Sequence, residues 1–152
     1  MFRRDVCTCL AALAMPALIL CGCASSGLQE SIGTPLPNVE RALAAAEITL
    51  PCTLSCAATW GQNRRRIKAL HDQQWWLDLA TSVAQIGLNN DLAYYYLGRA
   101  AEGLGYSEAA RIYYRLSLAA YSKCDGVVNN CDGLVIPVES QAGLKRVAPL
   151  AK

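Results

Sequence analysis

Apolar residues return every three to four positions through the middle of the chain, and this spacing predicts a series of α-helices. Residues 52–136 contain no proline, so nothing in this stretch breaks a helix by lacking a backbone N–H. Glycine-containing turns separate the periodic stretches, with Gly105 as a stop signal and Asp72 and Ser107 as candidate N-caps. The pattern predicts helices at about 55–70, 73–86, 91–104 and 107–121.

The segments on either side of this region have different patterns. Residues 24–38 are rich in Ser, Gly and Pro, which is typical of a tether. Residues 39–48 are predicted to form a short Ala-rich helix with Asn38 as its N-cap and Pro51 as its end. Residues 134–138 are predicted to be extended, and residues 141–152 to be a weak helix or a loose tail. The predicted fold class is all-α, with a disulfide-closed irregular C-terminal tail.

Three of the predicted helices repeat one pattern of aromatic, Leu and small residues. The pattern of the second helix recurs 18 residues later in the third, and less clearly in the fourth. Its offsets of 3, 4 and 7 place these residues on one helical face. A small residue beside the Leu allows a neighbouring helix to approach closely, which favours antiparallel helical hairpins. The two clearest copies are Trp76, Leu79, Ala80, Val83, Gly87 and Tyr94, Leu97, Gly98, Ala101, Gly105.

Residues 91–118 resemble one tetratricopeptide repeat. The matching positions are Tyr94, Leu97, Gly98, Ala101, Gly105, Ala110 and Tyr114, with Ser117 later in the second helix. Two positions depart from the family pattern: Tyr106 comes one place early, and Ser122 stands where a Pro usually closes the repeat. The resemblance implies a fragment of a tetratricopeptide-like α-solenoid, capped by its neighbouring helices. A plain four-helix bundle with an aromatic core is the alternative.

The N-terminus carries Arg3 and Arg4, followed by an apolar run over residues 6–20. This run is shorter than the ~20 apolar residues of a transmembrane helix and is typical of a secretory signal. The sequence Leu-Cys-Gly-Cys at residues 20–23 resembles the lipobox of bacterial lipoproteins. The resemblance implies that Cys23 is the first mature residue and carries a diacylglycerol and an N-acyl chain such as palmitate. Ala24 after it implies sorting to the outer membrane, facing the periplasm. An ordinary signal peptide and a transmembrane anchor are the alternatives.

These patterns divide the chain into four parts. They are a lipoprotein signal peptide (1–22), a lipidated Cys with a tether and short helix (23–50), a helical tetratricopeptide-like domain (51–123), and a disulfide loop with a C-terminal tail (124–152).

Four cysteines remain once the predicted signal peptide and the lipidated Cys23 are set aside: Cys52, Cys56, Cys124 and Cys131. An even number in an oxidising compartment predicts two disulfides, for which three pairings are possible. The short separations favour Cys52–Cys56 and Cys124–Cys131, and turn-forming residues lie between the second pair. A zinc site is the alternative, although these spacings do not match the usual zinc motifs.

The chain has 152 residues and a net charge of +2, which favours one domain and gives no electrostatic case for nucleic-acid binding. Its one cationic cluster is Arg64, Arg65 and Arg66. This cluster is either a solvated helix face or a contact for anionic head groups or an acidic partner. Three consecutive tyrosines cannot all face the core, and Tyr95 is the predicted recognition residue.

No catalytic set can be assembled from the sequence. His71 is the only histidine, there is no glycine-rich phosphate loop, and Asp72 and Asp78 fall on different helical faces. The protein is therefore predicted not to be an enzyme and to need no cofactor or metal beyond its covalent lipid. The expected role is a membrane-anchored adaptor that presents a helical surface to a protein or peptide. The alternatives are a fixed component of an envelope or secretion complex and, less favoured, a small envelope enzyme. The sequence does not predict the partner's identity or the oligomeric state.

Overall fold

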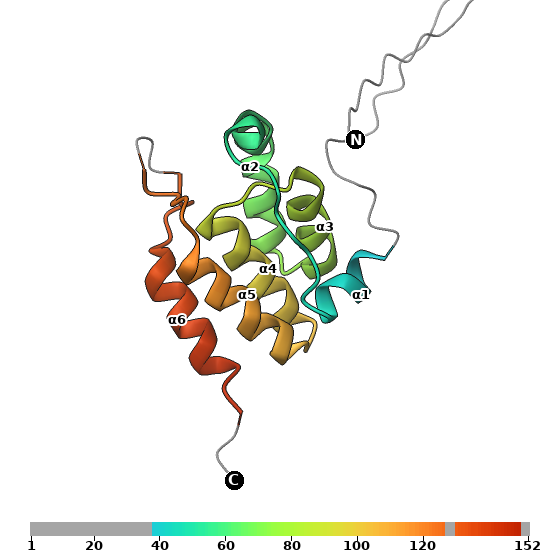
Figure 1. The fold of residues 1–152 in the computed structure, drawn as a ribbon. Helices are drawn as coiled ribbons and strands as arrows, with labels where there is room; N and C mark the ends of the chain where they lie inside the picture. The colour runs from blue at the N-terminus through green and yellow to red at the C-terminus, as the bar shows by residue number, and fades with distance from the viewer. Residues whose placement is uncertain (1–37, 127–129, 150–152) are drawn as a thin grey trace, which may run out of the picture.

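A computed structural model of the chain describes residues 38–126 and 130–149, which form an all-helical fold (Figure 1). The predicted signal peptide, Cys23 and the tether up to residue 37 lie outside the described residues. The described elements are α1 (Val39–Ala44), η1 (Leu54–Cys56), α2 (Ala57–Asp72), α3 (Trp76–Ile86), α4 (Asp91–Gly103), α5 (Ser107–Ala119) and α6 (Ile136–Arg146). The predicted all-α class is confirmed.

Each helix from α2 to α6 packs against the next one along the chain, so the helices lie in chain order across the molecule (Figure 1). The tightest pair is α4 and α5, which run antiparallel: Asp91 at the start of α4 lies beside Ser117 near the end of α5. Helix α6 packs on the α4–α5 pair. The core therefore lies around α4, whose Leu92, Tyr96 and Leu97 are fully buried.

Local signals explain where the best-predicted helices begin and end. The side chain of Asn90 accepts a hydrogen bond from the backbone N–H of Ala93 (2.8 Å) and caps α4. Asn38 caps α1 in the same way. Gly87 and Gly105 have φ of +69° and +84°, a left-handed conformation that glycine adopts without the steric cost of a Cβ atom.

Two predicted N-caps are wrong. Asp72 does not cap α3, because α2 continues through Asp72 and the chain then turns with Gln74 in the left-handed region. Helix α3 begins at Trp76 instead. Ser107 is the first residue of α5 rather than its cap, which is Tyr106. Neither Trp75 nor Tyr106, the cap residues of α3 and α5, makes a capping hydrogen bond with its side chain to the described part of its helix.

The C-terminal tail is not irregular as predicted. Residues 136–138, predicted to be extended, form the first turn of α6. Pro137 is compatible with this position, because the N–H that proline lacks would have no partner within the helix there. Ser140 and Gly143 of α6 are buried against α5, so the tail belongs to the core.

The segment that leads into the domain is also anchored in the core. Leu43, Ile48 and Leu50 are buried, and the backbone N–H of Ile48 donates to the hydroxyl of Tyr113 (3.0 Å). The short helix predicted next to the tether thus packs on the domain rather than extending from it.

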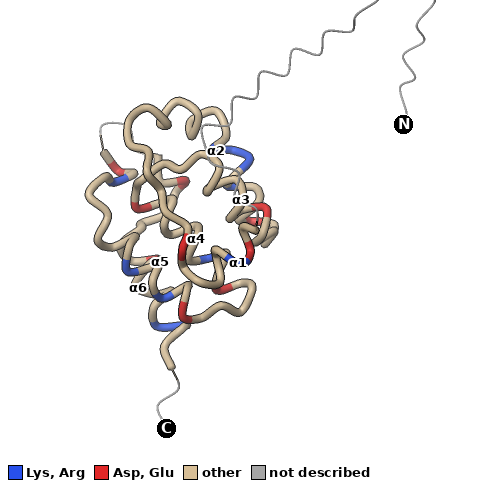
Figure 2. The backbone as a smooth tube through the Cα atoms, turned by 45° about the vertical axis from the view of Figure 1, so that its right-hand side comes forward, with Lys and Arg blue, Asp and Glu red and all other residues tan. Residues whose placement is uncertain are grey.

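Lys and Arg on the one hand and Asp and Glu on the other are spread over several elements of the described chain in Figure 2. No helix within the described ranges is long and apolar enough to cross a membrane.

Candidate functional site

Both predicted disulfides are present. Cys52 and Cys56 are joined across the turn that precedes α2, and Cys124 and Cys131 close the loop between α5 and α6. Since the four sulfur atoms bond to one another in pairs, they offer no thiolates to zinc in this structure. The backbone of Cys52 also pairs with the α3–α4 turn, accepting from the N–H of Asn89 (2.6 Å) and donating to the carbonyl of Gly87 (3.0 Å). This pairing fixes the N-terminal disulfide beside the start of α4.

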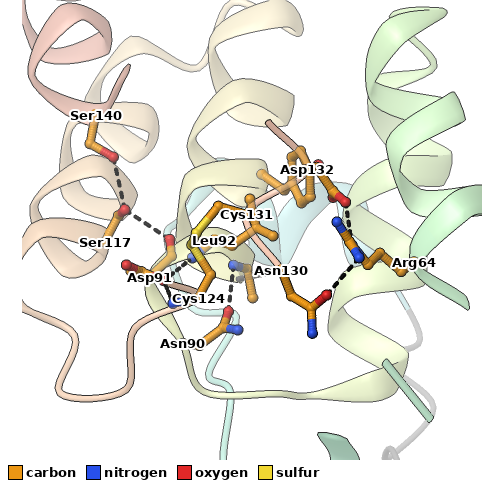
Figure 3. Close-up of a disulfide and its surroundings, with 12 residues drawn as sticks. Arg64, Asn90, Asp91, Leu92, Ser117, Cys124, Asn130, Cys131, Asp132 and Ser140 are labelled. Atoms are coloured by element: carbon orange, nitrogen blue, oxygen red, sulfur yellow. Dashed lines mark hydrogen bonds and ion pairs between the residues drawn. A yellow bond between two sulfur atoms is a disulfide. The ribbon is translucent and has the colours of Figure 1, made fainter. Parts of the chain in front are cut away.

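The C-terminal disulfide loop is held by a buried carboxylate (Figure 3). One oxygen of Asp91 accepts from the backbone N–H of Leu92 and of Cys124, both at 2.8 Å. Burial raises the pKa of Asp91 above its ordinary value, and these two hydrogen bonds oppose that rise. The hydroxyl of Ser117 donates to the carbonyl of Asp91 (2.8 Å) and lies 2.8 Å from the hydroxyl of Ser140. The first turn of α4 is thereby joined to α5, α6 and the disulfide.

Arg64 of α2 holds the far end of the same loop (Figure 3). Its guanidinium donates to the side chain of Asn130 (2.6 Å) and forms an ion pair with Asp132. The hydroxyl of Tyr96 donates to the other oxygen of Asp132 (2.6 Å). The predicted cationic cluster is thus divided, because Arg64 serves the fold while Arg65 and Arg66 are exposed.

A groove of about 590 Å³, which we call the apolar groove, lies between the two disulfides. Trp60, Leu88 and Cys124 line it and are buried. Leu54 and Tyr121 also line it, and they are respectively 88% and fully exposed. Large exposed apolar side chains beside a concave surface are typical of a binding site.

Helix α2 lines one side of the apolar groove, and at Gly61 it has no side chain there. A Cβ atom added at Gly61 would meet no described atom within 4 Å. Glycine within a helix costs about 1 kcal/mol relative to alanine, and no steric contact of the described chain requires it at this position. The remaining residues along the groove are Thr53, Ala57, Arg64, Asn90, Ser122, Lys123 and Asn130.

The groove was not predicted from the sequence, although two signals pointed to it. Gly61 interrupts an otherwise helical pattern, which usually has a packing or functional reason. The fourth helix was predicted to run to about residue 121, but α5 ends at Ala119 and Tyr121 projects into solvent.

The predicted recognition residue Tyr95 is 3% exposed and belongs to the core. Its ring contacts His71 and Tyr114. Tyr94 is the partly exposed member of the three tyrosines. The prediction is wrong because α6, of which only the part from residue 141 was predicted, as a weak helix or a loose tail, packs on the α4–α5 pair.

The residues that match the tetratricopeptide pattern come together where α4, α5 and α6 meet. Leu97, Ala101 and Ala110 are buried. A Cβ atom added at Gly98 of α4 would lie 2.7 Å from the Tyr114 ring, and one added at Gly143 of α6 would lie 2.4 Å from it. We call this arrangement of two glycines on one ring the Tyr114 junction. Its close packing through Gly98 was predicted, whereas the contribution of Gly143 was not.

A carboxylate completes the Tyr114 junction. Glu102 accepts from the Tyr114 hydroxyl, from Arg146 (2.6 Å) and from Arg99 (2.8 Å). Burial alone would raise the pKa of Glu102, but the hydrogen bonds from Arg146 and Tyr114 and the charges of both arginines together lower it. Burial and the hydrogen bond to Glu102 raise the pKa of Tyr114, so its hydroxyl keeps its proton near neutral pH.

A second, more open cleft of about 510 Å³ lies beside this junction and includes His71, Tyr95 and Glu139. The Nδ1 atom of His71 is 3.2 Å from Asp72, and its ring packs 5.2 Å from that of Tyr96. Both arginines of the cleft are already paired with Glu102. The charged side chains of this cleft therefore stabilise the Tyr114 junction, and we do not treat the cleft as a binding site. The absence of catalysis stays a prediction.

Comparison with protein families, with curated proteins and with solved structures found no match for this chain. The candidate site therefore stands on its geometry, in which the apolar groove combines concavity, exposed apolar side chains and a helix surface without a side chain.

Proposed function

We propose that this protein is a lipid-anchored binding protein of the bacterial envelope that docks a protein partner in its apolar groove. The observation that carries the proposal is the groove itself, where Leu54 and Tyr121 stand exposed above the buried Trp60. Burial of apolar surface is the main favourable term in most protein association, and aromatic side chains are frequent anchors at interfaces.

The lipobox at residues 20–23 supports the anchoring part of the proposal. Two or three acyl chains on Cys23 would hold the protein firmly, since each buried methylene contributes about 0.8 kcal/mol. An anchor in the outer membrane confines the domain to the bilayer surface and raises its effective concentration near membrane-bound partners. The order of helices along the chain and the α4–α5 hairpin are compatible with a tetratricopeptide-like arrangement, a class that presents binding surfaces, as they are with a helical bundle.

Site-specific photo-crosslinking in the bacterium that makes the protein tests this proposal. A photoreactive residue replaces Leu54, and in a matched variant it replaces Ile112, which is exposed on α5 outside the groove. We expect a discrete adduct from position 54 and none from position 112. Equal adducts at both positions, or none at 54, would contradict docking in the groove.

The same strain tests the anchor. With Cys23→Ala, the protein should move from the membrane fraction to the soluble fraction, and the adduct at position 54 should weaken. If the Cys23→Ala protein stays in the membrane fraction, the lipobox interpretation is wrong.

A further inference from the structure

We propose that the occupant of the apolar groove is an acidic, amphipathic polypeptide segment, with apolar side chains on Trp60 and Leu88 and carboxylates toward Lys123. This inference rests on the proposed function and adds the chemistry of the partner. It follows from the charges along the groove, from the height of its walls and from the position of Gly61.

The charges along the groove have one sign. Its described lining contains Arg64 and Lys123 and no Asp or Glu. Arg64 is neutralised by Asp132, whose side chain is 3% exposed. Lys123 is exposed, and its ammonium group donates to the carbonyl of Leu118 at 3.3 Å without forming an ion pair within the described chain. The charge of Lys123 acts on the buried Asp91 carboxylate without pairing with it. Within the described chain the exposed ammonium group at the rim therefore has no ion-pair partner, and an acidic partner would complement it.

The same charge argues against a second copy of this chain as the occupant. A two-fold interface places the same patch on both sides, and the described lining of the groove has no Asp or Glu that could pair with Lys123 of the other copy. Like charges opposed across an interface disfavour association.

The walls of the groove favour a polypeptide over a small amphiphile. Leu54 and Tyr121 project so far that most of their surface faces solvent. A ligand that fills only the hollow of about 590 Å³ would leave the outer sides of both side chains in water. A polypeptide segment that crosses the groove would cover these sides as well and bury more apolar surface.

The position of Gly61 also fits a polypeptide partner. The described helices contain three other glycines, and at each of them a Cβ atom would collide with an aromatic ring: Tyr114 at Gly98 and Gly143, and Trp76 at Gly103. At Gly61 the corresponding space is open to the groove. A glycine in this position lets another backbone or a bulky side chain approach α2 closely.

The test selects peptides on the full-length protein, immobilised in nonionic detergent, from a phage library of random 12-residue peptides. Clones that also bind the Gly61→Trp variant, in which an indole fills the groove, are removed. The best remaining peptide is synthesised, and its Kd is measured on the wild type, on Lys123→Glu and on Lys145→Glu. Lys145 is an exposed lysine of α6 outside the groove, so its variant carries the same charge change as a control.

We expect the groove-dependent peptides to carry a net negative charge together with aromatic or aliphatic residues. Their Kd should rise at least tenfold in Lys123→Glu, should change less than twofold in Lys145→Glu, and should rise with salt concentration because exposed charges are screened.

Neutral or basic peptides that depend on the groove would overturn this inference and leave the proposed function in place. If no clone distinguishes the wild type from Gly61→Trp, both fall. A concentration-dependent dimer that Gly61→Trp abolishes would show that the occupant is a second copy. Thermal melts of each variant confirm that it is folded.

Discussion

Two regions of this protein use glycine in opposite ways. At the Tyr114 junction, Gly98 and Gly143 have no side chain because a ring of the chain itself fills the space. At the apolar groove, Gly61 has no side chain and no described atom fills the space. The first arrangement joins three helices into one core. The second leaves part of α2 bare at the surface, where it adds nothing to the packing of the described chain. The comparison separates glycines that the fold requires from one that binding would explain.

The largest expected loss of stability comes from adding a side chain at the Tyr114 junction, where the space is already filled. Gly98→Leu should destabilise the protein by about 3 kcal/mol or more, because the added side chain must displace the Tyr114 ring from a close-packed core. Urea unfolding measures the change. Gly61→Leu is the matched control and should keep at least the wild-type stability. If both variants were equally stable, the Tyr114 junction would not be tightly packed.

The next effect tests how the C-terminal disulfide loop, one border of the groove, is fixed to the core. Asp91→Ala should cost about 2 kcal/mol, since it leaves the backbone N–H groups of Leu92 and Cys124 without their acceptor. Asp91→Asn keeps an oxygen acceptor and removes a buried charge, so its loss should be under about 1 kcal/mol. Thermal unfolding of both variants measures the difference. Equal losses in the two would mean that the charge, rather than the acceptor, matters.

A smaller effect depends on pH and belongs to the Tyr114 junction. The pKa of Glu102 is lowered in the folded protein from an ordinary value of 4.5. Its contribution to stability is therefore complete above that value and is lost as the pH falls through the folded pKa. Glu102→Gln should be less stable than the wild type at pH 7, and the gap should narrow between pH 5 and pH 3. Thermal melts across this range measure the gap, and a constant gap would contradict the ion-pair account.

The smallest expected effect is a gain in stability from a methyl group added at Gly61. Gly61→Ala should stabilise the protein by about 0.5–1 kcal/mol, because alanine has the higher helix propensity and its methyl group meets no described atom. A loss of stability in urea unfolding would show that the fold itself requires this glycine.

The best-predicted part of the fold is the α4–α5 pair, because its signals are local. Asn90 and Gly105 mark where the first helix begins and where the chain turns, and the spacing of Gly98 predicted a close helix contact. The two disulfides were predicted from short separations, helped by turn-forming residues between Cys124 and Cys131, since a loop of a few residues brings its own ends together.

Helix α6 could not be predicted with the same ease. Val135, Ile136 and Val138 favour extended structure by their β-branching, and Pro137 suggested a break. Tertiary contacts stabilise the helix instead. Gly143 fits against Tyr114, and the hydroxyl of Ser140 contacts that of Ser117. The charges were a usable signal, since Glu139 lies in the first turn of α6 and Arg146 in its last.

The candidate site depended on contacts that the sequence does not reveal. In the sequence, Arg64 cannot be distinguished from Arg65 and Arg66. Only the fold brings its partners Asn130 and Asp132 beside it. Tyr95 was predicted to be exposed because residues 141–152 were predicted only as a weak helix or a loose tail, whereas α6 packs firmly on the α4–α5 pair. The groove is lined by residues next to both disulfides, from Thr53 to Asn130, and these lie far apart in the sequence.

The most direct test of the central claim, that the protein acts by docking a partner in the apolar groove, is co-purification from detergent-solubilised membranes of the native bacterium. The wild type, Gly61→Ala and Gly61→Trp are compared at equal expression, with thermal melts of each. We predict that all three are folded, that the wild type retains one partner in fixed proportion, that Gly61→Ala retains less of it, and that Gly61→Trp loses it. A folded Gly61→Trp protein that keeps its partner in full would contradict the account.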